Sequence, residues 1–205
     1  MFDQLVFDRK INDLIRKGKQ REAESKLLEA HAELKAANAP SDLEHVAGRL
    51  AQFYSMPTTE DRVKAEQYFT ECESLSSTAY SRLQTATFYF YVLRDFPKTI
   101  RKVEDIKALK DVSGSPSYYS ALTLKGQALI NLGMIDDAGQ VLDELLSMIR
   151  GNPPKFPFGD EINLLEAAVS YEALVPTSHE ILSLIVPKIR SQEYVDRAKA
   201  LLKSL

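Results

Sequence analysis

The chain has 205 residues, of which 26 are lysine or arginine and 29 are aspartate or glutamate, and its formal net charge is -3. This length suits one domain or a short array of repeats, and the small net charge excludes a protein-wide field that attracts nucleic acid or anionic membranes. Its single cysteine, Cys72, excludes an internal disulfide, and a charged N-terminus without an apolar run predicts a cytoplasmic protein.

The first predicted helix pair covers residues 3–37 and turns at Gly18. Its two helices carry apolar residues at helical spacing: Phe7, Ile11, Leu14 and Ile15, then Ala23, Leu27, Ala30 and Leu34. Charged residues occupy the opposite faces, so each helix is expected to bury one side.

The second predicted pair covers residues 41–75. Pro40 breaks the chain before it, and Ser41 with Glu44 has the spacing of a capping box. The two expected buried stripes are Leu43, Val46, Ala47 and Leu50, then Ala65, Phe69 and Cys72. Cys72 occupies a small-residue position, and no histidine or second cysteine lies at the spacing that a nucleophile or a metal site would need. This predicts a buried thiol that serves packing.

The third predicted pair covers residues 78–111 and turns at residues 94–97. Pro97 suits the first turn of its second helix, where the missing donor has little effect. The run from Phe88 to Tyr91 surrounds its helix with apolar side chains and therefore requires burial on several sides.

The fourth predicted pair, residues 117–150, has the clearest pattern. Leu122, Gly126 and Leu129 share one stripe, Gly133 makes the turn, and Ala138, Leu142 and Leu145 share the stripe that follows. Gly126 and Ala138 are expected where these two helices cross, because small residues allow close approach.

This alternation of small and large residues resembles the tetratricopeptide repeat, a family whose units are helix pairs. The resemblance covers residues 3–150 with degenerate motifs. It implies an all-α fold, an α-α superhelix of antiparallel helix pairs in one domain over residues 1–205. A fifth pair is expected at about residues 160–190, after a loop rich in proline and phenylalanine at 151–159. A terminal helix at about 192–204 is expected to cap the array.

The sequence contains no motif of an enzyme or a cofactor site. It has no glycine-rich phosphate loop and no nucleophile elbow, and its three histidines sit in separate segments without carboxylate or cysteine partners at metal-ligand spacing. Asp136 and Asp137 begin a helix, where carboxylates favour the positive end of the dipole. We therefore expect no catalysis, metal or cofactor.

The family resemblance implies that first helices line a concave groove. The groove positions are Asp8, Asn12, Arg16, Glu44, His45, Gln52, Gln84, Phe88, Tyr91, Thr123, Gln127, Ile130 and Asn131. Their amides could pair with an extended peptide backbone, and Phe88 and Tyr91 could accept an apolar side chain. The alternative for both aromatics is burial beneath the next repeat. Some members of this family hold the C-terminal tails of chaperones by a clamp of basic residues that binds the tail's carboxylate. Asp8, Ser81 and Thr85 stand at the positions of those basic residues, so such tails are not expected to bind.

These observations predict a non-enzymatic protein-protein interaction module that holds an unidentified peptide or protein in the groove. The alternative is a structural, self-associating protein, a homodimer formed through the convex face or the loop at 151–159. RNA binding through the basic stretch 94–110 is a weaker hypothesis, because acids interleave with its bases. We expect no nucleic-acid partner and no membrane partner.

Overall fold

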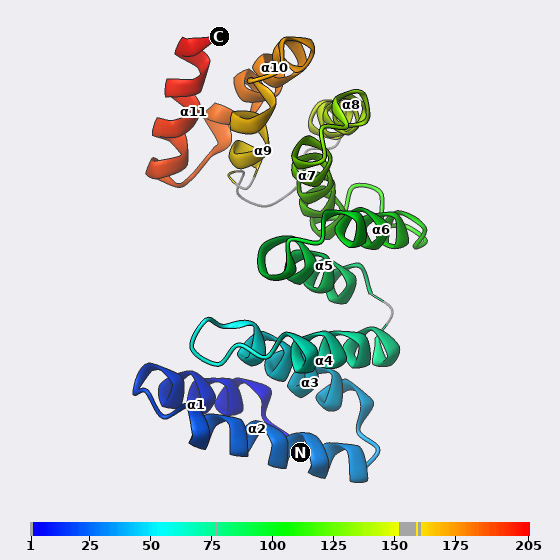
Figure 1. The fold of residues 1–205 in the computed structure, drawn as a ribbon, viewed down its shortest axis with the longest axis vertical. Helices are drawn as coiled ribbons and strands as arrows, with labels where there is room; N and C mark the ends of the chain where they lie inside the picture. The colour runs from blue at the N-terminus through cyan, green and yellow to red at the C-terminus, as the bar shows by residue number, and fades with distance from the viewer. Residues whose placement is uncertain (1, 77, 152–158, 160) are drawn as a thin grey trace. The chain divides into compact units, whose positions relative to one another are not determined.

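The computed structural model describes residues 2–76, 78–151, 159 and 161–205, and over these residues every regular element is a helix (Figure 1). The chain divides into two compact units, Met1–Phe88 and Tyr89–Leu205. This division falls inside the third predicted helix pair. The expected single domain stays a prediction, and each unit is considered by itself below.

The described residues of the first unit form five helices that pack against their neighbours in chain order. They are α1 (Gln4–Arg16), α2 (Gln20–Ala36), α3 (Pro40–Ser55), α4 (Arg62–Leu75) and α5 (Ala79–Phe88). The predicted stripes of α2, α3 and α4 are buried, including Leu27, Leu50 and Cys72. Helical periodicity therefore located the core of this unit, because a helix buries one face and exposes the other.

Local backbone geometry explains where these helices end. Gly18 has φ +72° between α1 and α2, and Asn38 has φ +50° between α2 and α3. The predicted capping box is wrong: α3 begins at Pro40, and its N-cap residue is Ala39, which lies two residues before Ser41 and makes no side-chain cap. Proline favours the first helical turn because its φ is already fixed there.

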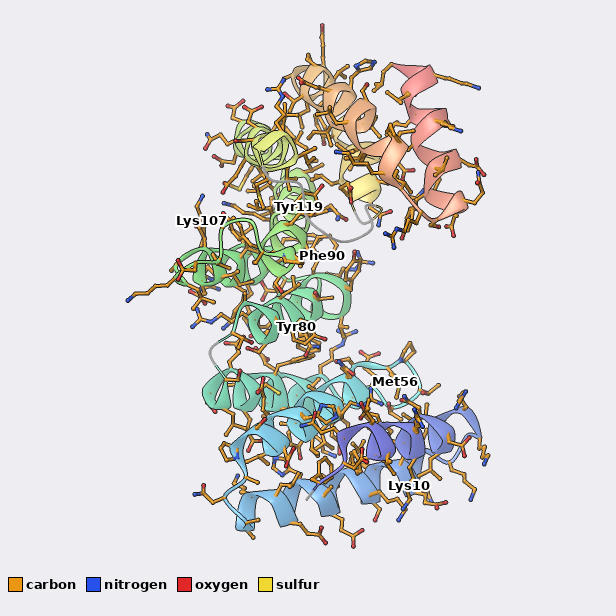
Figure 2. The ribbon with its side chains drawn as sticks, turned by 180° about the vertical axis from the view of Figure 1, so that it is seen from behind. Lys10, Met56, Tyr80, Phe90, Lys107 and Tyr119 are labelled. Carbon is orange, nitrogen blue, oxygen red and sulfur yellow. The ribbon has the colours of Figure 1, made fainter. Side chains whose placement is uncertain are left out.

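The second unit begins with a π-helical turn, η1 (Tyr89–Leu93), which continues directly from α5. Its α-helices are α6 (Phe96–Lys107), α7 (Pro116–Asn131), α8 (Ile135–Gly151), α9 (Glu161–Ala168), α10 (Val175–Ile185) and α11 (Gln192–Ser204). Two short 3-10 turns, η2 (Glu172–Leu174) and η3 (Val186–Lys188), flank α10. Figure 2 shows Phe90 and Tyr119, which are both buried in this unit.

Gly126 on α7 has a second neighbour in addition to α8, the one that the sequence predicts. A Cβ atom at Gly126 would lie 2.9 Å from both methyl carbons of Leu164 on α9 and 3.4 Å from Val141 on α8. The small residue therefore accommodates α9 as well as α8. Ala138 is fully buried, as expected.

The fifth pair expected at about residues 160–190 stays a prediction, and the described residues there form two α-helices, α9 and α10. α9 ends at Ala168, and Pro176 lies in the first turn of α10. The predicted terminal helix is present as α11, which packs on α9 and α10. On α11, Ala198 is fully buried, whereas Val195, Leu201 and Leu202 are partly exposed.

Candidate binding surface

Two cavities lie in the first unit, at the place where side chains of α1 and α3 meet. The polar cavity encloses about 370 Å³ and is lined by Gln4, Asp8, Ser41, Glu44, His45, Gly48, Arg49, Gln52, Cys72, Tyr80, Ser81 and Gln84. The arginine-rimmed cavity encloses about 610 Å³ and is lined by Arg9, Ile11, Asn12, Ile15, Arg16, Arg49, Gln52, Phe53 and Met56. Because Arg49 and Gln52 line both, the cavities adjoin. We call all these lining residues the α1–α3 surface.

Arg49 organises this surface by joining the two helices. Its Nε lies 3.2 Å from Asp8 Oδ1, one Nη atom donates to Gln52 Oε1 at 3.1 Å, and the other donates to Asn12 Oδ1. The Nε hydrogen has no hydrogen-bond acceptor within the described chain, although the Asp8 carboxylate is close enough for an ion pair. The guanidinium therefore retains donor capacity beyond the bonds it already makes.

His45 adds a second contact between the same helices. Its Nε2 lies 3.0 Å from Asp8 Oδ1, and both side chains are about a quarter exposed. Nearer the start of the helices, Gln4 Nε2 donates to Asp42 Oδ1 at 2.8 Å. Polar side chains thus hold α1 beside α3 along this face, and they fix the walls of both cavities.

The floor of the polar cavity is formed by small groups. Gly48 exposes helix backbone, and Cys72 Sγ donates to the carbonyl oxygen of Glu44 at 3.4 Å. Burial, followed by the charge of Glu44, raises the pKa of the Cys72 thiol to about 12. The thiol is therefore protonated at neutral pH and packs as predicted. Figure 2 labels Tyr80, an exposed lining residue of this cavity on α5.

The structure brings seven of the sequence-predicted groove residues onto this surface, among them Asp8 and Glu44, which line the polar cavity. His45 and Gln84 line the polar cavity, Asn12 and Arg16 line the arginine-rimmed cavity, and Gln52 lines both. Their role in binding stays a prediction. Arg9, Gly48 and Met56 were missed, and so was Arg49. Arg49 lies one helical turn after His45, so helical spacing would have found it.

Phe88 requires a correction because it lies in the core. It is 3% exposed and contacts Phe69 with ring centroids 5.1 Å apart, so it does not offer an open apolar surface. Burial is the alternative for Phe88, but the ring contacts the preceding helix α4, whereas that alternative places it beneath the next repeat. Its apolar ring packs against α4 because burial there removes more surface from water than an open groove position would.

The other predicted groove residues belong to the second unit. Tyr91 is 49% exposed, Gln127 is partly exposed, and Asn131 is exposed and donates to the carbonyl oxygen of Gln127 at 2.8 Å. Thr123 and Ile130 are buried, which removes both from the expected groove. The predicted site at the 151–159 loop lies outside the described residues, except for Gly151 and Gly159.

A third cavity in the first unit, about 760 Å³, has charges that are mostly paired with one another. Lys19 lies 3.0 Å from Glu22, and Tyr54 Oη donates to Glu24 at 2.6 Å. Burial, with the bond to Glu24, raises the pKa of Tyr54 above its ordinary value. Because these groups satisfy one another, this cavity makes less demand on a charged ligand than the arginine-rimmed cavity does.

Two further observations concern metal binding and membrane spans. Among the described residues, no three His, Cys, Asp or Glu side chains gather as a metal site would require. No helix in the described part of the chain is long and apolar enough to cross a membrane.

Comparison with known proteins finds a solved structure with a similar fold. No family model matches the chain, and no curated protein matches its sequence. A solved structure of PilW, described as a widely conserved type IV pilus biogenesis factor, is similar with a TM-score of 0.53 and 16% identity over 98% of this chain and 92% of that chain. The chain has an all-α helical-repeat fold. This likeness shows the fold alone, so the tetratricopeptide family remains a resemblance.

Proposed function

We propose that the first unit is a non-enzymatic protein-interaction module that holds a peptide or protein segment on the α1–α3 surface. The observation that carries the proposal is the pair of adjoining cavities joined by Arg49 and Gln52. Exposed amides beside partly apolar cavities suit a peptide, because the amides pair with its backbone and the cavities accept its side chains.

The fold supports this proposal at a general level. The similar protein PilW is described as a biogenesis factor, which is consistent with a role in assembling other proteins. A cytoplasmic location also remains a proposal, as does the absence of catalysis.

Panning a displayed library of random peptides of about twelve residues on the full chain tests the proposal. The blocking variant is Gly48→Gln. A Cβ at Gly48 makes ordinary contacts, 3.6 Å to Cys72 Sγ and 3.9 Å to Gln84 Oε1, so the longer side chain extends at a residue that lines the polar cavity. Glutamine also favours helix more than glycine does, so α3 should remain folded.

We expect the enriched peptides to bind the native chain and to lose about ten-fold in affinity for Gly48→Gln, as measured by fluorescence anisotropy. Lys10→Gln is the control, since Lys10 is exposed on α1 and lines neither cavity. Circular dichroism confirms that each variant is folded. Equal binding by Gly48→Gln, or no enrichment above an unrelated immobilised protein, would reject the proposal.

A further inference from the structure

The geometry points to an acidic segment with an apolar side chain as the ligand of the α1–α3 surface, with the apolar side chain in the arginine-rimmed cavity and its acidic neighbours on Arg9 and Arg16. This inference rests on the proposed function and names the chemistry of its ligand. The carboxylates are those of glutamate or aspartate side chains inside a chain segment.

The cavity supplies the apolar part of this recognition. Ile11 and Phe53 are almost fully buried beneath it, and Ile15 and Met56 are partly exposed at its wall. Figure 2 labels Met56 directly after α3. A volume of about 610 Å³ accommodates a leucine-sized side chain together with some of its backbone. Burial of such a side chain removes apolar surface from water on both partners.

The charged residues that line the cavity are of one sign. Arg9, Arg16 and Arg49 line it, and none of its lining residues in the described chain is acidic. Arg9 makes no hydrogen bond or ion pair with any described residue. Arg16 reaches Asp13 only at 4.0 Å with its side chain 76% exposed, and such surface pairs contribute little.

Arginine suits this role because its planar guanidinium donates two parallel hydrogen bonds to one carboxylate. Arg49 is already paired with Asp8, so it contributes orientation through Asn12 and Gln52 more than net charge. The exposed arginines Arg9 and Arg16 therefore carry the attraction for the ligand.

Nucleic acid also carries negative charge, but the surface fits it less well. Asp8 and Glu44 line the adjoining polar cavity, where they would repel a continuous phosphate backbone. The described floor of the arginine-rimmed cavity is aliphatic except for buried Phe53, so it offers no open aromatic platform for base stacking.

The test measures binding of the full chain to a series of synthetic peptides with blocked ends. Each peptide carries one central leucine flanked by glutamates, by lysines or by glutamines, and a fourth peptide replaces the leucine of the glutamate series by serine. We expect the glutamate peptide to bind at least about ten-fold more tightly than the lysine peptide. Replacing leucine by serine should weaken binding about five-fold or more.

Two charge-reversed double variants locate the contact. Arg9→Glu with Arg16→Glu should weaken the glutamate peptide by about ten-fold or more and should improve the lysine peptide. Lys10→Glu with Arg21→Glu makes the same charge change on exposed residues of the same unit that do not line either cavity of the α1–α3 surface. Its effect should stay within about three-fold, and circular dichroism checks the fold of both.

The inference is overturned if the lysine peptide binds as tightly as the glutamate peptide, or if both double variants lose binding equally. Tighter binding of single-stranded RNA than of the peptide, or binding only to a free C-terminal carboxylate, overturns it too. Peptides from the library that depend on Gly48 but not on acidic residues would reject this inference and leave the proposed function standing.

Discussion

Cys72 shows how burial changes the chemistry of one residue. Burial beneath α3, followed by the neighbouring acidic charges, raises the pKa of its thiol to about 12 from an ordinary value of 9.0. An unfolded chain loses this proton at a lower pH than the native chain does. Stability from this group is therefore complete below about pH 9 and decreases as the pH rises toward 12.

The prediction compares the native chain with Cys72→Ala. Above about pH 9 the free energy of unfolding of the unsubstituted protein, relative to that of Cys72→Ala, should fall by about 1.4 kcal/mol per pH unit. Only the unsubstituted protein has a thiol that must stay protonated when it is buried. Urea unfolding of both proteins at about pH 8 and about pH 10 measures this difference. Both proteins contain the same tyrosines, so the effect of tyrosine titration on the two unfolding free energies cancels in the difference. A difference that does not change with pH would contradict a buried thiol.

Gly126 is a residue whose size matters for packing. A Cβ there would lie 2.9 Å from both methyl carbons of Leu164, which is fully buried and has little room to move. Gly126→Leu should therefore reduce the free energy of unfolding by about 1 to 3 kcal/mol. Thermal and urea unfolding measure this loss.

Leu164→Ala provides the control for that prediction. Alone it should destabilise by about 2 to 5 kcal/mol, but together with Gly126→Leu it makes room for the new side chain. The double variant should therefore be more stable than the sum of the two losses indicates. Strict additivity would show that residues 126 and 164 do not share this space.

At the level of elements, helix starts in the first unit differ in how they are capped. Asp61 accepts a hydrogen bond from the Lys64 backbone N–H at 3.1 Å at the start of α4. α3 instead begins at Pro40 without a side-chain cap. Asp61→Ala should therefore lower the free energy of unfolding by about 1 kcal/mol, whereas Ser41→Ala should lower it by only a few tenths of a kcal/mol. Urea unfolding of both variants tests this, and equal losses would restore the predicted capping box.

At the level of the whole molecule, each of the two compact units has its own buried residues. Leu142 on α8 and Leu50 on α3 are both fully buried, one in each unit. Leu142→Ala should destabilise by about 2 to 5 kcal/mol and increase hydrogen exchange mainly within residues 89–205. Leu50→Ala should affect residues 2–88 in the same way. Equal loss of protection in both units would show that the chain unfolds as one.

The amino-acid sequence by itself determined the all-α class, the helix pairs and most of the core, because helical periodicity and turn-forming residues such as Gly18 and Gly133 act locally. It also placed Asn12, Arg16, His45 and Gln52 on helix faces that meet in the structure.

Only the tertiary structure decided which neighbours those faces meet. Whether Phe88 is open or buried depends on α4, and whether Gly126 faces α8 alone or also α9 depends on a helix far along the chain. The pairing of Arg49 with Asp8 and the unpaired state of Arg9 likewise depend on the positions of two helices together. Contacts between distant residues require the packed chain, since local spacing fixes the face of a helix but not the partner it meets.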